Sequence, residues 1–128
     1  MRMARQMTLS VYSCGLDGEE GKGRTRYGIL MVHLRVAQAL GAPFTGTPQE
    51  ATAYYVGAVG PDCGAYIAEN VFDPPTQVTH WAPDGYKRNC DALLFVSAYL
   101  EAKLSRRSAR LYTAYYIHLL TDCAWVRE

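Results

Sequence analysis

Residues 91–104, DALLFVSAYLEAKL, form the stretch that decides the predicted fold. Apolar side chains stand at most of its positions, so a helix made from it would be apolar nearly all round. Such a helix is stable only where other elements cover most of its sides. We therefore expect a central buried helix near 91–104, with the rest of the chain packed around it.

The segment that follows predicts an amphipathic helix at the C-terminal end. Between Leu111 and Cys123, apolar and aromatic residues recur with the spacing of one helix face. The residues on this face are Leu111, Tyr112, Tyr115, Tyr116, Leu119, Leu120 and Cys123. We expect this face to pack, and its tyrosines to lie in the core or in a dimer interface.

Two more helices are expected earlier in the chain. Residues 47–50, TPQE, have the pattern of a capping box with proline at the first helical position. This pattern predicts a helix from Pro48 to about Ala58. The apolar stretch Ile29–Leu40, which Gly41 follows, suits another helix, although its first half could equally start as a strand.

Short strands and turns complete the predicted fold. Met7–Ser13 and Gln77–Trp81 alternate apolar and polar residues, which is typical of strands. Residues 65–71 suit a short helix or a strand, and 61–64 and 83–85 have the composition of turns. The whole pattern predicts an α+β fold. We expect a single compact domain over residues 1–128, with a small antiparallel sheet packed with helices and residues 1–6 as a short tail.

Composition narrows the possible partners and the compartment. Thirteen basic and twelve acidic residues leave a net charge of +1, too little for a general nucleic-acid coat. No apolar run is long enough for a membrane span, and no secretory leader is recognisable, so we expect a cytoplasmic protein with reduced thiols.

The possible metal ligands are scattered along the chain. The four cysteines are far apart, and His33, His80 and His118 each stand alone. Structural zinc sites use closely spaced ligand pairs. The sequence therefore predicts no metal site and no cofactor.

Basic residues point to an anion as ligand. Residues 14–28, CGLDGEEGKGRTRYG, form a glycine-rich charged segment whose Arg24 and Arg26 offer forked donors for phosphate or carboxylate. A second cluster comprises Lys103, Arg106, Arg107 and Arg110. On a helix these four would share one face, either as an anion site or as an ordinary solvated surface.

Three more residues complete a candidate nucleotide site. Asn89 and Asp91 can contact the polar edges of a base or ribose, and either can instead cap the helix that follows. Trp81 can stack on a base or fill the edge of the core. No GxSxG, P-loop, HExxH or GxGxxG motif occurs, and no local motif pairs a cysteine with a histidine, so we expect a protein that is not an enzyme.

These residues resemble the phage sponge proteins that defeat Thoeris immunity by sequestering cyclic ADP-ribose isomers. Asn89-Cys90-Asp91 is similar to the Asn-x-Asp pair of that family, and Arg106 matches its downstream arginine. The resemblance implies a homodimer that encloses the nucleotide. It implies that Trp81 stacks on the base and that Arg24 or Arg26 is the early arginine.

The leading functional hypothesis is therefore a non-enzymatic sponge that sequesters an anionic signalling nucleotide in an infected bacterial host. That nucleotide would be a cyclic ADP-ribose isomer or a cyclic oligonucleotide. The alternative is an inhibitor of the anti-CRISPR type, which would bind a host immune complex through the acidic half of residues 14–28. An enzyme acting on nucleotides and a nucleic-acid binder are further alternatives.

Overall fold

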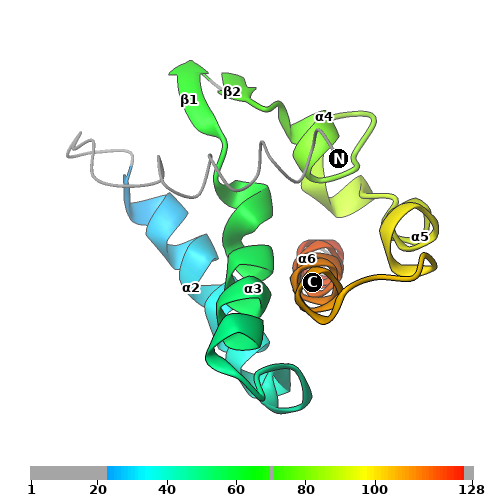
Figure 1. Cartoon of the computed structure of the whole chain (residues 1–128). Helices are drawn as coiled ribbons and strands as arrows, with labels where there is room; N and C mark the ends of the chain where they lie inside the picture. The colour runs from blue at the N-terminus through cyan, green and yellow to red at the C-terminus, as the bar shows by residue number, and fades with distance from the viewer. Residues whose placement is uncertain (1–22, 70, 126–128) are drawn as a thin grey trace.

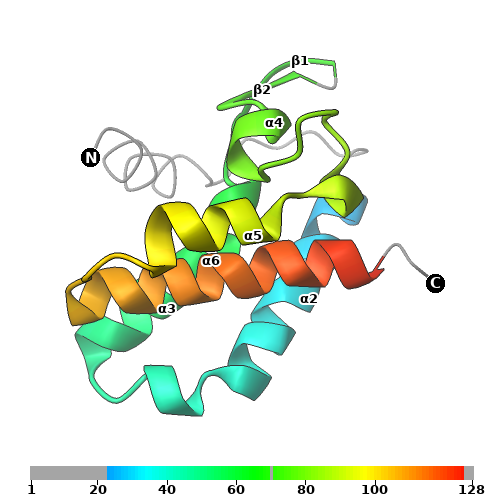
Figure 2. The same cartoon turned by 90° about the vertical axis from the view of Figure 1, so that its right-hand side faces the viewer.

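A computed structural model describes residues 23–69 and 71–125, with side chains from residue 30 onward (Figure 1). The long helices are α2 (Gly23–Leu40), α3 (Pro48–Val59) and α6 (Arg106–Trp125). Helix α6 packs against α2 and α3 on one side and against α5 (Ala92–Phe95) on the other (Figures 1 and 2). The remaining elements are short: η1 (Ala42–Phe44), η2 (Gly60–Asp62), β1 (Ala65–Ala68), β2 (Val71–Asp73), α4 (Thr76–Thr79), η3 (Lys87–Asn89) and η4 (Val96–Leu100).

The start of α3 confirms the predicted N-cap. Thr47 Oγ1 accepts a hydrogen bond from the Glu50 backbone N–H at 3.2 Å, and Pro48 is the first helical residue. The Glu50 carboxylate turns toward α6, where Oε1 lies 3.4 Å from Nη2 of Arg110. The cap therefore sets where α3 begins, and its acidic residue helps to join the two helices.

Helices α3 and α6 approach most closely at Gly57. A Cβ built on Gly57 would lie 2.0 Å from the backbone oxygen of Leu111. Any other residue there would force the helices apart, because protein interiors are close-packed. The absence of a side chain at this position therefore sets the distance between the two helices.

The sheet is small and antiparallel, as predicted. Strands β1 and β2 pair with Ala65 opposite Asp73 and Tyr66 opposite Phe72. Of the two structures predicted for residues 65–71, a short helix or a strand, the first four residues form a strand. The predicted strand Met7–Ser13, the tail of residues 1–6 and most of the segment 14–28 lie outside the described residues. Residues 23–28 of that segment are helical.

The predicted strand Gln77–Trp81 is wrong. These residues begin inside the helical turn α4, and the backbone N–H groups of Val78 and His80 donate to the carbonyls of Pro75 and Thr76. Pro75 favours a helical turn here, because it is the N-cap residue of α4 and its own backbone is extended. The turn predicted at 83–85 is confirmed, with Gly85 N–H donating to Ala82 at 2.8 Å.

Helix α6 occupies the centre that the sequence predicted for 91–104. A helix does form in 91–104, but α5 and the π-turn η4 are short, and Leu93 is 76% exposed. Only one side of α5 meets another helix (Figure 2), and Leu93 and Leu94 are exposed while Phe95 is buried. The predicted C-terminal amphipathic helix is confirmed, and its Ala114, Tyr115 and Leu119 are fully buried.

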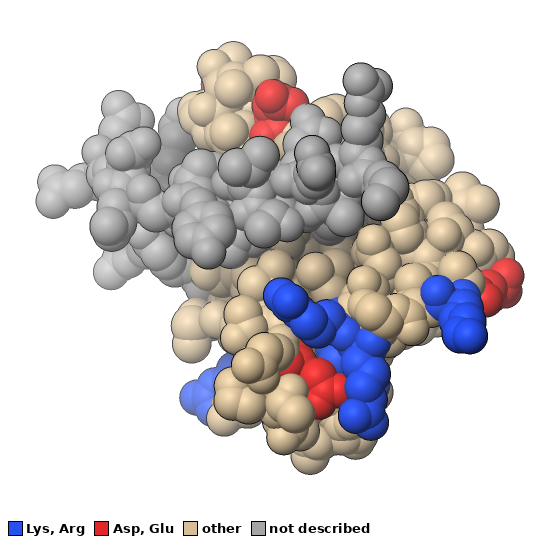
Figure 3. Space-filling view, in the orientation of Figure 1, with Lys and Arg blue, Asp and Glu red and all other residues tan. Residues whose placement is uncertain are grey.

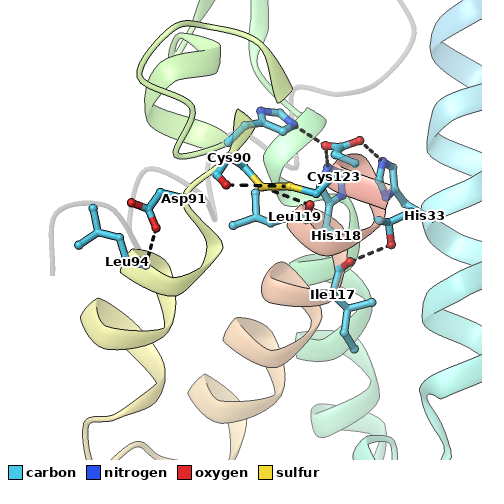
Figure 4. Close-up of a disulfide and its surroundings, with 11 residues drawn as sticks. His33, Cys90, Asp91, Leu94, Ile117, His118, Leu119 and Cys123 are labelled. Carbon is cyan, nitrogen blue, oxygen red and sulfur yellow. Dashed lines mark hydrogen bonds and ion pairs between the residues drawn. A yellow bond between two sulfur atoms is a disulfide. The ribbon is translucent and has the colours of Figure 1, made fainter. Parts of the chain in front are cut away.

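Cys90 and Cys123 form a disulfide that ties the segment after η3 to the end of α6 (Figure 4). Their Cα atoms lie 6.7 Å apart. The expectation of reduced thiols is wrong for this pair. Thirty-two residues separate these cysteines, so no local motif could indicate the bond. Among the described residues, no helix has the length and apolar character needed to cross a bilayer.

Candidate metal centre

Three histidines and two aspartates meet in the interior of the domain. His33 comes from α2, Asp62 ends η2, His80 follows α4, and His118 and Asp122 lie one turn apart on α6. Four of the five are buried, and the Asp62 side chain keeps only 15% of its surface exposed. Figure 4 shows the rings of His33 and His118 side by side, close to the disulfide. Four separate segments of the chain therefore build one polar cluster.

Each carboxylate lies near the Nε2 atoms of all three histidines. Oxygens of Asp122 lie 3.2 Å from His33, 3.4 Å from His80 and 3.3 Å from His118. Oxygens of Asp62 lie 3.7, 3.1 and 3.7 Å from the same three rings. The three imidazoles thus turn the same ring nitrogen toward the same pair of carboxylates.

The partners of the other ring nitrogens fix how two of these rings are oriented. Nδ1 of His118 lies 2.7 Å from the backbone oxygen of Ala58, which can only accept, so this nitrogen carries a proton. Nδ1 of His80 lies 2.8 Å from the hydroxyl of Thr79. A hydrogen bond of this kind to the far nitrogen is the usual support for a metal-binding histidine.

Hydrogen bonds alone do not satisfy the centre. Nε2 of His118 and Oδ2 of Asp122 are both buried, lie 3.3 Å apart, and have no hydrogen-bond partner. A neutral His118 protonated on Nδ1 presents a lone pair on Nε2, and this lone pair faces two carboxylates. A charged His118 would instead place an imidazolium against His33, whose ring is stacked on it at 3.5 Å. A cation between these atoms resolves both conflicts.

Two groups of three residues have distances that suit one transition-metal ion, and both groups include His118. Imidazole nitrogens and carboxylate oxygens bind zinc at about 2.1 Å, so neighbouring ligand atoms lie about 3.0 to 3.4 Å apart. The nitrogen–oxygen separations here run from 3.1 to 3.7 Å. His33, Asp62 and His118 each offer one ligand atom within 4.8 Å of the others, and so do His80, His118 and Asp122. The sequence predicted no metal site, whereas the structure brings together residues whose ligand types and spacing suit a metal ion.

Charges around the centre keep the carboxylates ionised. Burial raises the pKa of Asp62, but His80, His118 and Lys87 outweigh it and hold that pKa well below its usual range. Burial also raises the pKa of Asp122, and His118 and His33 reverse the effect. The pKa of His80 is lowered, chiefly by burial, so its neutral form is favoured. Ionised carboxylates and neutral imidazoles are the forms that bind metals.

The residues predicted for the nucleotide site have structural partners. Asn89 Nδ2 donates to Asp84 at 2.6 Å, and Asp91 caps α5 by accepting from the Leu94 N–H at 2.9 Å (Figure 4). Trp81 packs edge-on against the Phe95 ring, whose centroid is 5.7 Å away. Asp91 therefore acts as a helix cap, and Trp81 fills the edge of the core. These are the structural alternatives that the sequence offered for the two residues.

The predicted site residues do not all come together within one chain. Arg106 is exposed at the start of α6, with its Nε 3.7 Å from Glu50 Oε1, where basic side chains surround an acidic one (Figure 3). Cys90, between Asn89 and Asp91, lies 3.3 Å from the Leu119 carbonyl near the other end of α6. At 1.5 Å per residue, these points are about 20 Å apart along the helix. The side chains of Arg24 and Arg26 lie outside the description.

Sequence reasoning missed the whole centre because its members are distant in sequence. The one local signal is the four-residue spacing of His118 and Asp122, which places both on the same face of a helix. That face is otherwise the packing face, so two polar residues on it indicate a buried polar cluster. Nothing local predicts that His33, Asp62 and His80 join them.

Comparisons of this chain with known protein families, with curated proteins and with solved structures find no match. The function of this chain is therefore inferred from the chemistry of its own residues.

Proposed function

We propose that the protein is a metalloprotein that binds one divalent transition-metal ion within the cluster of His33, His80, His118, Asp62 and Asp122, whose two groups of three ligand atoms both include His118. The observation that carries the proposal is a pair of buried atoms without hydrogen-bond partners, Nε2 of His118 and Oδ2 of Asp122, which lie 3.3 Å apart. Nitrogen and oxygen lone pairs at that separation both gain by sharing a cation. Mixed imidazole and carboxylate ligands suit zinc, iron, cobalt or manganese better than calcium or copper(I).

The ligand set also indicates what such a metal could do. A structural zinc ion usually takes four protein ligands and has no place for another molecule. Here the ligand atoms within reach of one ion form two groups of three, and an ion held by three protein ligands keeps a position for water or another ligand. A water bound there would lose its proton near neutral pH, which makes the centre suited to hydrolytic chemistry as well as to binding.

Metal titration tests the proposal directly. The chelator-treated wild-type protein should take up one equivalent of Co²⁺, giving visible absorption bands whose intensity reports coordination number, and Zn²⁺ should displace it. His118→Asn keeps an N–H near the Ala58 carbonyl but removes Nε2, and Asp122→Asn removes one charge at constant size. Each should weaken cobalt binding at least about 100-fold, in line with the loss of a metal ligand.

Asp84→Asn is the matched control, because Asp84 is an exposed aspartate outside the centre. It should bind cobalt as the wild type does. Far-ultraviolet circular dichroism establishes that each variant is folded before titration. Wild-type protein that takes up no cobalt, or a folded His118→Asn variant that binds as tightly as wild type, would overturn the proposal.

A further inference from the structure

Lys87 stands at the exposed side of the metal centre. Its Nζ contacts Oδ1 of Asp62, the more exposed of the two carboxylates. The Lys87 side chain keeps 35% of its surface exposed, whereas those of the three histidines keep at most 3%. Among the described residues of this centre, the Asp62–Lys87 pair is therefore its solvent-facing edge.

Charge balance changes when a metal ion binds. Two carboxylates and one ammonium give the centre a net charge of −1 when the histidines are neutral, and a divalent ion raises it to +1. Lys87 then shares Asp62 with the metal, and the two cations repel each other at close range. A partly buried positive centre of this kind is stabilised by an anion that contacts both cations.

The neighbouring side chains favour an anion as well. Lys87 begins the short helix η3, and Arg88 follows it with its guanidinium 5.2 Å from the centre of the Tyr86 ring. Beyond Asp62, the nearby acidic groups already have partners: Asp84 accepts from the Asn89 amide and the Tyr86 N–H, and Asp91 caps α5. The Lys87 ammonium therefore stands at the edge through which a ligand would approach, and the next residue in the chain is also cationic.

We propose that the metal ion and Lys87 together bind a phosphate group, with one phosphate oxygen on the metal and another accepting from the Lys87 ammonium. This inference rests on the proposed metal centre and names the ligand class of the same site. A phosphate group has the charge and the several acceptor oxygens that such bridging requires, and a compact lysine ammonium is a common partner for it. A carboxylate carries less charge to neutralise two cations, so we expect weaker binding of acetate.

The test uses the full chain loaded with Co²⁺ and titrated separately with inorganic phosphate, adenosine monophosphate and acetate. Both phosphate-bearing probes should shift the visible cobalt bands with saturable affinity, and acetate should bind at least ten-fold more weakly. Tighter binding of the nucleotide would identify a phosphate ester as the ligand, and equal binding would identify phosphate itself. The chelator-treated protein should bind neither probe.

Variants of Lys87 separate its role from that of the metal. Lys87→Gln should weaken phosphate binding at least ten-fold while cobalt affinity is retained or improved, because the lysine no longer competes for Asp62. Lys87→Arg keeps the charge and should restore most of the binding. Lys103→Gln, an exposed lysine near the start of α6, is the matched control and should bind phosphate as wild type does.

The outcomes are distinct. Cobalt-loaded wild-type protein that binds no phosphate would overturn this inference and leave the metal proposal standing. Equal phosphate affinity in Lys87→Gln and wild type would also overturn it, as would binding of acetate as tight as that of phosphate. Failure to take up cobalt would overturn the metal proposal and this inference together.

Discussion

Replacing Gly57 with alanine should damage both the fold and the metal centre, because it separates α3 from α6. The new Cβ would lie 2.0 Å from the Leu111 backbone oxygen, whereas contacts below 3.0 Å are essentially never found. The helices must therefore separate by about 1 Å at this point, since a backbone oxygen cannot turn away as a side chain can. Ala58, the next residue, holds His118 through its carbonyl at 2.7 Å, and the same movement stretches that bond.

The expected loss of stability follows from two opposing effects. Overpacking a core costs about 1–3 kcal/mol, and a backbone clash belongs at the upper end. Alanine is about 1 kcal/mol better than glycine inside a helix, which offsets part of this cost. The net loss is about 2 kcal/mol, equivalent to a urea midpoint about 1 M lower for a slope of about 2 kcal/mol/M. Cobalt affinity should fall about 10- to 100-fold, as when the support of a metal-binding histidine is lost.

Urea unfolding and cobalt titration of the same preparation measure both effects. Gly46→Ala is the control, because a Cβ there would meet only Glu50 Oε2, at an ordinary 3.5 Å. A Gly57→Ala protein as stable as wild type would refute the close approach of α3 and α6. Lower stability with unchanged cobalt affinity would refute the link between that approach and the position of His118.

Three further predictions concern stability. Reducing the Cys90–Cys123 disulfide should lower the free energy of unfolding by up to about 4 kcal/mol, the chain-entropy value for a loop of this length, and guanidinium unfolding with and without reductant measures it. Thr47→Ala should cost about 1 kcal/mol through loss of the α3 cap, while the exposed Thr52→Ala should be close to neutral in thermal unfolding. The metal-free protein should lose stability as pH falls below 6.5, and further below 3.8, because the lowered pKa values of His80, Asp62 and Asp122 mean that the unfolded chain binds more protons. A urea midpoint that stays constant from pH 7 to pH 3 would contradict this last expectation.

Local chemistry was enough to predict the elements whose signals are local. The TPQE cap marks the start of α3, and the packing stripe of 111–123 marks α6, because each pattern depends on residues within a few turns of one another. The prediction of a strand at Gln77–Trp81 was wrong because its local signal was too short. Alternation over five residues fits a short helical turn equally well, and the hydrogen bonds to Pro75 and Thr76 decide between them.

The place of 91–104 could not be predicted from its own composition. An apolar stretch shows only that some neighbour should cover it, and α6 covers one side alone, so Phe95 is buried while Leu93 is exposed.

The roles of the nucleotide-site residues could not be predicted from their chemistry alone either. Asp91 has the chemistry of a ligand and of a cap, and the structure uses it as a cap. The sponge hypothesis stays a prediction, and it now requires a second copy of the chain to bring Arg106 near Asn89. The anti-CRISPR alternative also stays a prediction, because its acidic residues lie outside the described part.

The polar centre is a costly arrangement if stability is its only role. Buried ionic clusters are often no more stable than apolar residues of the same volume, and each unpartnered polar atom adds a penalty. Here three histidines, two aspartates and a lysine occupy the place where α2, α3 and α6 meet, and atoms of His118 and Asp122 remain without hydrogen-bond partners. Two unrelated features stabilise this region. Gly57 allows α3 and α6 to approach closely, and the disulfide at Cys123 lies next to Asp122. A fold that fixes its least favourable interior so firmly is best explained by a cation that belongs there, with Lys87 at the edge where an anionic ligand would reach it.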